Sequence, residues 1–213
     1  MAKLKRKIVK HRKDTFAIIV DGETEVWYFQ MLKRNEPSLQ VNIEPKIPQK
    51  KKLAEQYKKV LELAEDYTKV FWIIDLDVLI AESKVAKKGG VNKIRQLRDY
   101  LNELKIKYNN VITILNNPCL EYWFVLHFKQ TTKYFSKCSD AEKQLKKHLI
   151  DYEKTQKYFT KQDNDIYLKL KSRLSTAIAN SKGMQRMNID EIERGICEMN
   201  LFFENEQIII KYE

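Results

Sequence analysis

Acidic residues that directly follow two apolar runs are the strongest chemical signal in the sequence. Asp21 follows the first run, with Glu25 four residues later, and Asp75 and Asp77 follow the second. The i, i+2 spacing of Asp75 and Asp77 is expected to point both carboxylates to the same side of an extended segment. Four carboxylates brought together repel one another unless they are protonated or share a cation. Hard oxygen ligands of this kind suit Mg²⁺ or Mn²⁺, although acids after strands also serve as ordinary helix caps and turn residues.

Alternating strands and helices in the first half of the chain must position these acids. The two apolar runs, at residues 15–20 and 70–74, are typical of buried parallel strands. Further strands are expected at 41–44 and 111–115, and amphipathic helices at 23–34, 53–64 and 91–104. This alternation predicts an α/β fold, a parallel Rossmann-like sheet flanked by helices. The carboxyl ends of such strands face the ligand crevice, so the four acids should converge there.

The second half of the chain reads as mostly helical. After a turn at Asn117-Pro118, a short aromatic helix is expected at 120–128, and further helices at 139–150, 163–182 and 188–203. A final strand at 207–212 could pair at a sheet edge within the chain or across a homodimer. The predicted organisation is a basic arm at 1–13, an α/β core at 14–130, and a mostly helical extension at 131–213 that packs on the core.

The charge of the chain favours a polyanionic partner. The 213 residues carry a formal net charge of +11, and the arm at 1–13 alone holds seven Lys or Arg. Residues 184–213 hold three basic residues against seven acids, a net of −4, which leaves +15 on residues 1–183. Attraction to phosphates is the simplest explanation; the alternative is that Lys-rich helices only keep the protein soluble.

The cysteines and the apolar segments bear on the cellular compartment. Cys119, Cys138 and Cys197 are widely spaced, form no CxxC pair and have no His cluster beside them, which argues against a zinc site or a disulfide framework. Free thiols suit a reducing cytosol. The basic amino terminus lacks the apolar run of a signal peptide, and no stretch approaches the roughly 20 apolar residues that span a bilayer. These features predict a soluble, cytoplasmic protein without a membrane partner.

Two blocks of the sequence resemble a known family. Asp21-Gly22-Glu23-Thr24-Glu25 is similar to the E-G-x-T-E motif of Toprim domains, and Asp75-Leu76-Asp77 to their D-x-D motif. Together with Asn117-Pro118-Cys119-Leu120-Glu121-Tyr122-Trp123-Phe124-Val125-Leu126-His127-Phe128, the first block resembles the RloB-like proteins. The resemblance implies a Toprim-fold, metal-dependent phosphodiester nuclease of bacterial phage defence or restriction, often encoded beside an ATPase partner.

The resemblance also implies a role for each acid. Asp21 takes the place of the first Toprim glutamate, one methylene shorter, and Glu25 that of the second acid. Asp75 and Asp77 become the D-x-D metal ligands, while Val78 stands where the family often has a further acid. Asp21 or Glu25 would then hold a second metal or act as general base.

Other side chains have weaker assignments. Glu121, on an aromatic helix, needs a partner if it is buried: either the metal site or a Lys or Arg. Cys119 reads as a small packed residue, Thr24 as a helix cap, and His127 as a structural histidine or, alternatively, a proton-transfer group. Lys84, Lys87 and Lys88, in the expected loop after Asp77, and Lys182 are the candidate phosphate contacts.

Two functions fit these observations. The leading hypothesis is a Mg²⁺-dependent endonuclease acting on DNA or RNA. The alternative is a nucleic-acid-binding subunit with a degenerate Toprim site that works with an ATPase partner. Topoisomerase or primase chemistry needs further domains for which 213 residues leave no room.

Overall fold

The part of the chain that the structure describes includes most of the predicted site residues but not all of them. The computed structural model describes residues 15–20, 22–39, 41–44, 52–85, 91–206, 208 and 210. Asp21, Lys87, Lys88 and the predicted basic arm lie outside the described residues.

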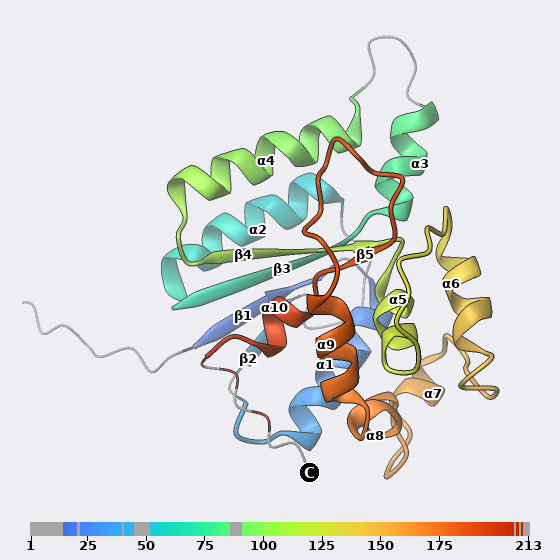
Figure 1. The fold of residues 1–213 in the computed structure, drawn as a ribbon. Coiled ribbons are helices and arrows are strands. Elements are labelled where there is room, and N and C mark those ends of the chain that lie inside the picture. The colour runs from blue at the N-terminus through green and yellow to red at the C-terminus, as the bar shows by residue number, and fades with distance from the viewer. Residues whose placement is uncertain are drawn as a thin grey trace, which may run out of the picture.

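A five-stranded sheet in the order β2-β1-β3-β4-β5 forms the centre of the fold (Figure 1). The strands are β1 Phe16–Ile19, β2 Val41–Glu44, β3 Lys69–Asp75, β4 Val111–Asn117 and β5 Ile196–Cys197. The first four pair in parallel, and β5 pairs antiparallel with β4 at the edge. The predicted α/β class with a Rossmann-like sheet is confirmed.

Helices cover both faces of the sheet because its strands are buried on both faces. Ile18 and Phe71 belong to one hydrophobic core, whereas Ile19 and Trp72 belong to a second core on the opposite face. This alternation follows from the two-residue period of a strand. The first core contains residues of α1 Glu23–Asn35, α5 Leu120–Leu126, α9 Leu174–Lys182 and α10 Asn200–Phe203, and the second contains residues of α2 Leu53–Asp66 and α4 Lys93–Lys107.

The remaining helices lie beyond the carboxyl ends of the parallel strands or continue the first core. They are α3 Asp77–Val85, α6 Cys138–Leu145, α7 Gln156–Phe159 and α8 Ile166–Lys171. In Figure 1, α5 and α6 lie side by side at the end of the sheet where β3 and β4 finish. None of the helices among the described residues has the length and apolar character needed to cross a bilayer.

The carboxyl-terminal part differs from the sequence-based expectation. The helix predicted at 188–203 is wrong: this segment holds turns, the strand β5 and only the short helix α10. The segment packs closely at Gly195, where a Cβ would collide with the Lys133 carbonyl and the Tyr122 hydroxyl. Of the strand predicted at 207–212, Ile208 and Ile210 are described; both are buried and neither is in a strand.

His127 is a structural histidine, the first of the two alternatives that the sequence offered. Its side chain is buried, and Nδ1 lies 2.9 Å from the Trp123 carbonyl oxygen, to which it donates a hydrogen bond as the protonated nitrogen. Nε2 has no hydrogen-bond partner among the described residues. Burial lowers the pKa of His127 to about 3, so the ring is neutral in the folded protein at neutral pH.

The buried ring predicts an acid-sensitive fold. Since the pKa of His127 is about 3 in the folded protein and about 6.5 in the unfolded chain, the unfolded chain binds more protons between these values. This residue should therefore lower the free energy of unfolding by about 2 kcal/mol between pH 6.5 and pH 5. The free energy of unfolding, measured with denaturant at several pH values, should change less steeply with pH for His127→Gln than for the wild type. The exposed His148 gives the matched control. If His148→Gln reduced the pH dependence of the unfolding free energy equally, His127 would not be the source of the acid sensitivity.

Candidate functional site

The acids of two strand ends meet in one cavity of about 400 Å³ at the carboxyl edge of the sheet. Glu25, Asp75 and Asp77 all contribute to its wall, so the structure brings together the three predicted acids that it describes. The lining is completed by Gly22, Glu23, Thr24, Trp27, Val78, Cys119, Cys138 and Lys154. The cavity thus combines carboxylates, one lysine and two sulfur-bearing residues.

Glu25 is a buried carboxyl group in the first turn of α1. Its side chain is 3% exposed, and the Thr24 hydroxyl lies 3.2 Å from each of its carboxylate oxygens. Burial, reinforced by the charge of Glu121, raises the pKa of Glu25. The prediction that Thr24 caps the helix is wrong, because Gly22 occupies the N-cap and the Thr24 hydroxyl faces Glu25.

Gly22 lies directly against this carboxylate. Its backbone is extended, with φ −124° and ψ 167°, so a left-handed conformation is not the reason for a glycine here. A Cβ built on Gly22 would instead overlap with Oε2 of Glu25. The glycine of the motif therefore makes room for the motif's own acid.

The Asp75 carboxylate accepts hydrogen bonds from residues of β4 and α5. The backbone N–H of Leu120 donates to Oδ2 at 3.1 Å, and Nδ2 of Asn116 donates to Oδ1 at 3.3 Å. The Asp75 carboxyl also interacts with that of Glu25. Such a carboxyl pair shares a proton or a cation, because two bare carboxylates in contact repel each other.

Asp77 starts a helix instead of continuing the strand. Its Oδ1 accepts from the Val78 N–H at 2.7 Å, and its Oδ2 accepts from the Cys138 N–H at 3.2 Å. The expectation that Asp75 and Asp77 share one extended segment is therefore wrong: Asp75 ends β3 and Asp77 begins α3. Both nevertheless line the same cavity.

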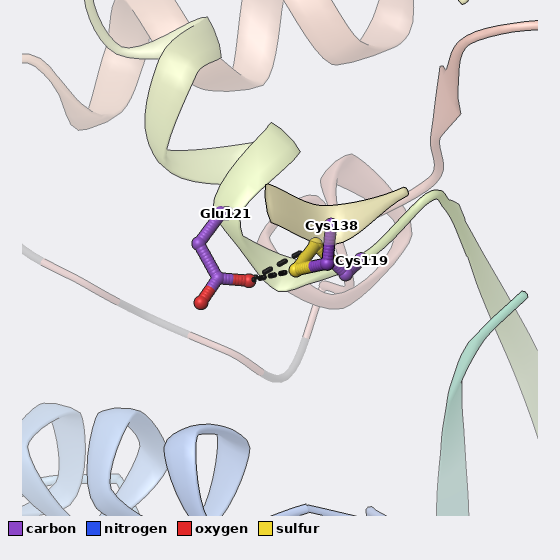
Figure 2. A group of neighbouring side chains, drawn as sticks. All are labelled: Cys119, Glu121 and Cys138. Atoms are coloured by element: carbon purple, nitrogen blue, oxygen red, sulfur yellow. Dashed lines mark hydrogen bonds between the residues drawn. A yellow bond between two sulfur atoms is a disulfide. The ribbon is translucent and has the colours of Figure 1, made fainter. Parts of the chain in front are cut away.

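Glu121 lies behind this wall, fully buried in the first turn of α5. Its Oε1 accepts from the Tyr152 hydroxyl at 2.9 Å and pairs with the Lys154 ammonium at 2.8 Å. Its Oε2 lies 3.0 Å from Sγ of Cys119 and 2.8 Å from Sγ of Cys138, as Figure 2 shows. Of the two partners considered from the sequence, the lysine is the one that binds Glu121 directly.

Cys119 and Cys138 form a disulfide, which corrects the expectation of free thiols at these positions. Their Cα atoms lie 5.6 Å apart although 19 residues separate them in the chain. Cys197 is free and buried. The Cys119, Glu121 and Cys138 ligand atoms all lie within 4.8 Å of one another, a spacing that suits a metal ion. Metal binding by these cysteines needs thiolates, however, so the disulfide form offers no such site.

Lys154 is the residue that the sequence did not reveal. It lies in the segment between α6 and α7, lines the cavity, and pairs with the buried Glu121. Burial lowers the pKa of Lys154, but the charges of Glu121, Glu25 and Asp75 outweigh it and leave the pKa above its usual value. No motif or spacing distinguishes this lysine from the many others in the chain.

The predicted phosphate contacts that the structure describes lie away from the cavity wall. Lys84 belongs to α3, not to a loop, and its Nζ lies 3.5 Å from a carboxylate oxygen of Glu193. Lys182 ends α9, and its Nζ lies 2.7 Å from Oε1 of Glu204. Neither is among the residues that line the cavity.

The donor set at the cavity fits a hard divalent cation. Glu25, Asp75 and Asp77 supply carboxylate oxygens, the ligands that Mg²⁺ and Mn²⁺ prefer. A cation there would also relieve the crowding of negative charge that contributes to the raised pKa of Glu25. These three acids would hold it, with Glu121 and Lys154 behind them.

The Gly22–Glu25 contact predicts an energetic coupling between the two positions. Gly22→Ala should lower the free energy of unfolding by about 2 kcal/mol, because the buried carboxylate must move away from the new methyl group. In a Glu25→Ala background the same substitution should cost at least about 1 kcal/mol less. Denaturant unfolding of the wild type, the two single variants and the double variant measures this coupling as a double-mutant cycle. Gly183→Ala is the control, because its Cβ would lie no closer than 3.5 Å to the nearest described atoms. Equal costs of Gly22→Ala in both backgrounds would contradict the contact.

Comparison with known proteins gives a family for the whole described fold. Neither the search of curated proteins nor the search of solved structures found a match. The model of the RloB-like protein family matches residues 16–205, which include both blocks of the resemblance and nearly the whole described chain. The chain therefore belongs to the RloB-like protein family.

Proposed function

We propose that this protein is a metal-dependent phosphodiester nuclease that acts on DNA or RNA. The observation that carries the proposal is the cavity in which Glu25, Asp75 and Asp77 converge from two strand ends, with Lys154 at its wall. Membership of the RloB-like family is compatible with this activity. By the same resemblance, the role we propose is in phage defence or restriction.

The residues of the cavity divide the chemical work among them. Mg²⁺ or Mn²⁺, when bound, would neutralise the scissile phosphate and stabilise the leaving oxygen. Asp75 and Asp77 are held in place by the Leu120 and Cys138 backbone N–H groups. Glu25, which lines the same cavity as Asp75, would help to hold the cation or accept a proton from the attacking water. The Lys154 ammonium would attract a phosphate oxygen.

The charge of the chain supports a nucleic-acid substrate. A net charge of +11 attracts a polyanion from a distance and strengthens its binding at low salt. Lys84 and Lys182 are 56% and 68% exposed in the side chain. Their ion pairs therefore contribute little to stability and are readily exchanged for phosphates.

A second candidate is a nucleic-acid-binding subunit without catalytic activity. One observation favours it: Lys154 already supplies a positive charge to the buried acids, so part of the negative charge is balanced without a metal. In addition, Val78 occupies the position where the family often has a further acid.

Substitution of one acid separates the two candidates. Purified wild-type protein should cleave plasmid DNA or RNA in the presence of Mg²⁺ or Mn²⁺, and Asp75→Asn should reduce the cleavage rate at least about 100-fold. The loss follows because the amide keeps the shape of the side chain but removes its charge. Asp66→Asn, an exposed acid at the end of α2, is the matched control and should leave the rate unchanged.

Binding without cleavage would decide for the second candidate. If the wild type binds oligonucleotides but cleaves none of them, and if Mn²⁺ changes neither its binding nor its thermal stability, the nuclease proposal fails and the binding subunit stands.

A further inference from the structure

The disulfide between Cys119 and Cys138 forms part of the wall of the acid-lined cavity. Cys119 is 2% exposed and precedes α5, whereas Cys138 is half-buried and begins α6. The bond therefore joins the amino-terminal ends of two helices at the place where the candidate metal ligands lie. None of the chemistry proposed above uses it.

Each half of this cross-link is adjacent to a backbone donor that positions one candidate ligand. The N–H of Leu120, the residue after Cys119, donates to Oδ2 of Asp75 at 3.1 Å. The N–H of Cys138 itself donates to Oδ2 of Asp77 at 3.2 Å. The disulfide thus fixes the spacing of the two N–H groups that orient Asp75 and Asp77.

The surroundings of the sulfur atoms also accommodate the reduced form. Oε2 of Glu121 lies 3.0 and 2.8 Å from the two sulfur atoms, as the dashed lines in Figure 2 mark. A disulfide has no S–H group to donate, but two thiols at these positions would both donate to that oxygen. Meanwhile Tyr152 and Lys154 hold the other oxygen, Oε1, so Glu121 stays in place in either state.

The cavity gives a reductant access to the bond. Both cysteines line a space of about 400 Å³, large enough to admit a small dithiol. The Lys154 ammonium lies 3.8 Å from Sγ of Cys138, where it would offset part of the repulsion between a thiolate leaving group and the Glu121 carboxylate, 2.8 Å from that sulfur.

From this arrangement we propose that Cys119 and Cys138 are a reversible thiol–disulfide pair whose oxidised form positions Asp75 and Asp77 for metal binding. The proposal rests on the proposed metal-dependent function. In the reduction, an external dithiol gives two electrons and two protons to the disulfide, which becomes two thiols while the dithiol becomes a cyclic disulfide. In the reverse step, oxidised glutathione takes two electrons and two protons from the thiols and is released as two molecules of glutathione.

Reduction acts on the metal ligands through the amino-terminal end of α6. When the bond breaks, the two sulfur atoms separate to a non-bonded distance. Cys138 is the more exposed of the two residues, so its backbone should move more than that of the fully packed α5. The Cys138 N–H then holds Asp77 less precisely. Loss of such supporting hydrogen bonds typically costs 10- to 100-fold in metal affinity.

The test compares Mn²⁺ binding by the full chain in two redox states. Isothermal titration should give at least about tenfold weaker Mn²⁺ binding in excess dithiothreitol than after treatment with oxidised glutathione, and reoxidation should restore the affinity. Alkylation and mass spectrometry should find a 119–138 bond in the oxidised sample only. Cys138→Ala should bind Mn²⁺ as weakly as the reduced wild type in both conditions. Cys197→Ala, which removes the free cysteine, should respond to redox state like the wild type.

Two results would overturn the proposal, and they are distinguishable. Tight Mn²⁺ binding that differs less than twofold between the two states, with the disulfide verified, would refute the redox coupling and leave the metal-dependent function intact. Absence of Mn²⁺ binding in both states, with folded protein and a verified disulfide, would refute the proposed function together with the coupling.

Discussion

Two carboxyl groups, Glu25 and Glu121, are buried close enough to interact electrostatically, and the rest of the site depends on how this charge is accommodated. Removing a carboxylate from water is costly unless a cation or hydrogen-bond donors replace the solvent. Glu121 has both, in Lys154 and Tyr152. Glu25 has the Thr24 hydroxyl and the Asp75 carboxyl, and its raised pKa reflects the weaker compensation.

This constraint explains why the site combines distant parts of the chain. Gly22 and Glu25 belong to the first βα connection, and Asp75 and Asp77 flank the end of β3. Glu121 and the donor of Leu120 come from α5, whereas Tyr152 and Lys154 come from the segment after α6. The sheet brings three acids together, whereas α5 and the segment between α6 and α7 supply the donors and the lysine that make their burial tolerable.

The sequence predicted the sheet and the acids better than their surroundings. The strands β1 to β4 and the helices α1, α2, α4 and α5 appear where short apolar runs and helical spacing indicate them, since both patterns report burial directly. The acids at the strand ends converge because parallel topology requires it.

Other features depended on contacts that no local pattern encodes. Asp77 begins a helix because the chain turns immediately after β3. Cys119 and Cys138 pair because α6 returns beside α5, a tertiary contact that their spacing in the chain does not reveal. Lys154 is distinguished from other lysines only by its position in the fold. Turns replace a predicted helix near Gly195, where the segment passes against Tyr122 and the Lys133 carbonyl.

The cavity at the carboxyl edge of the sheet should bind a divalent cation through its carboxylates. The most direct measurement is anomalous X-ray diffraction from crystals grown with Mn²⁺. We expect one or two anomalous peaks in the cavity, in contact with the carboxylate of Asp75 and with at least one of the carboxylates of Glu25 and Asp77. A well-ordered cavity without a peak, in which Lys154 alone balances the charge of the acids, would contradict it.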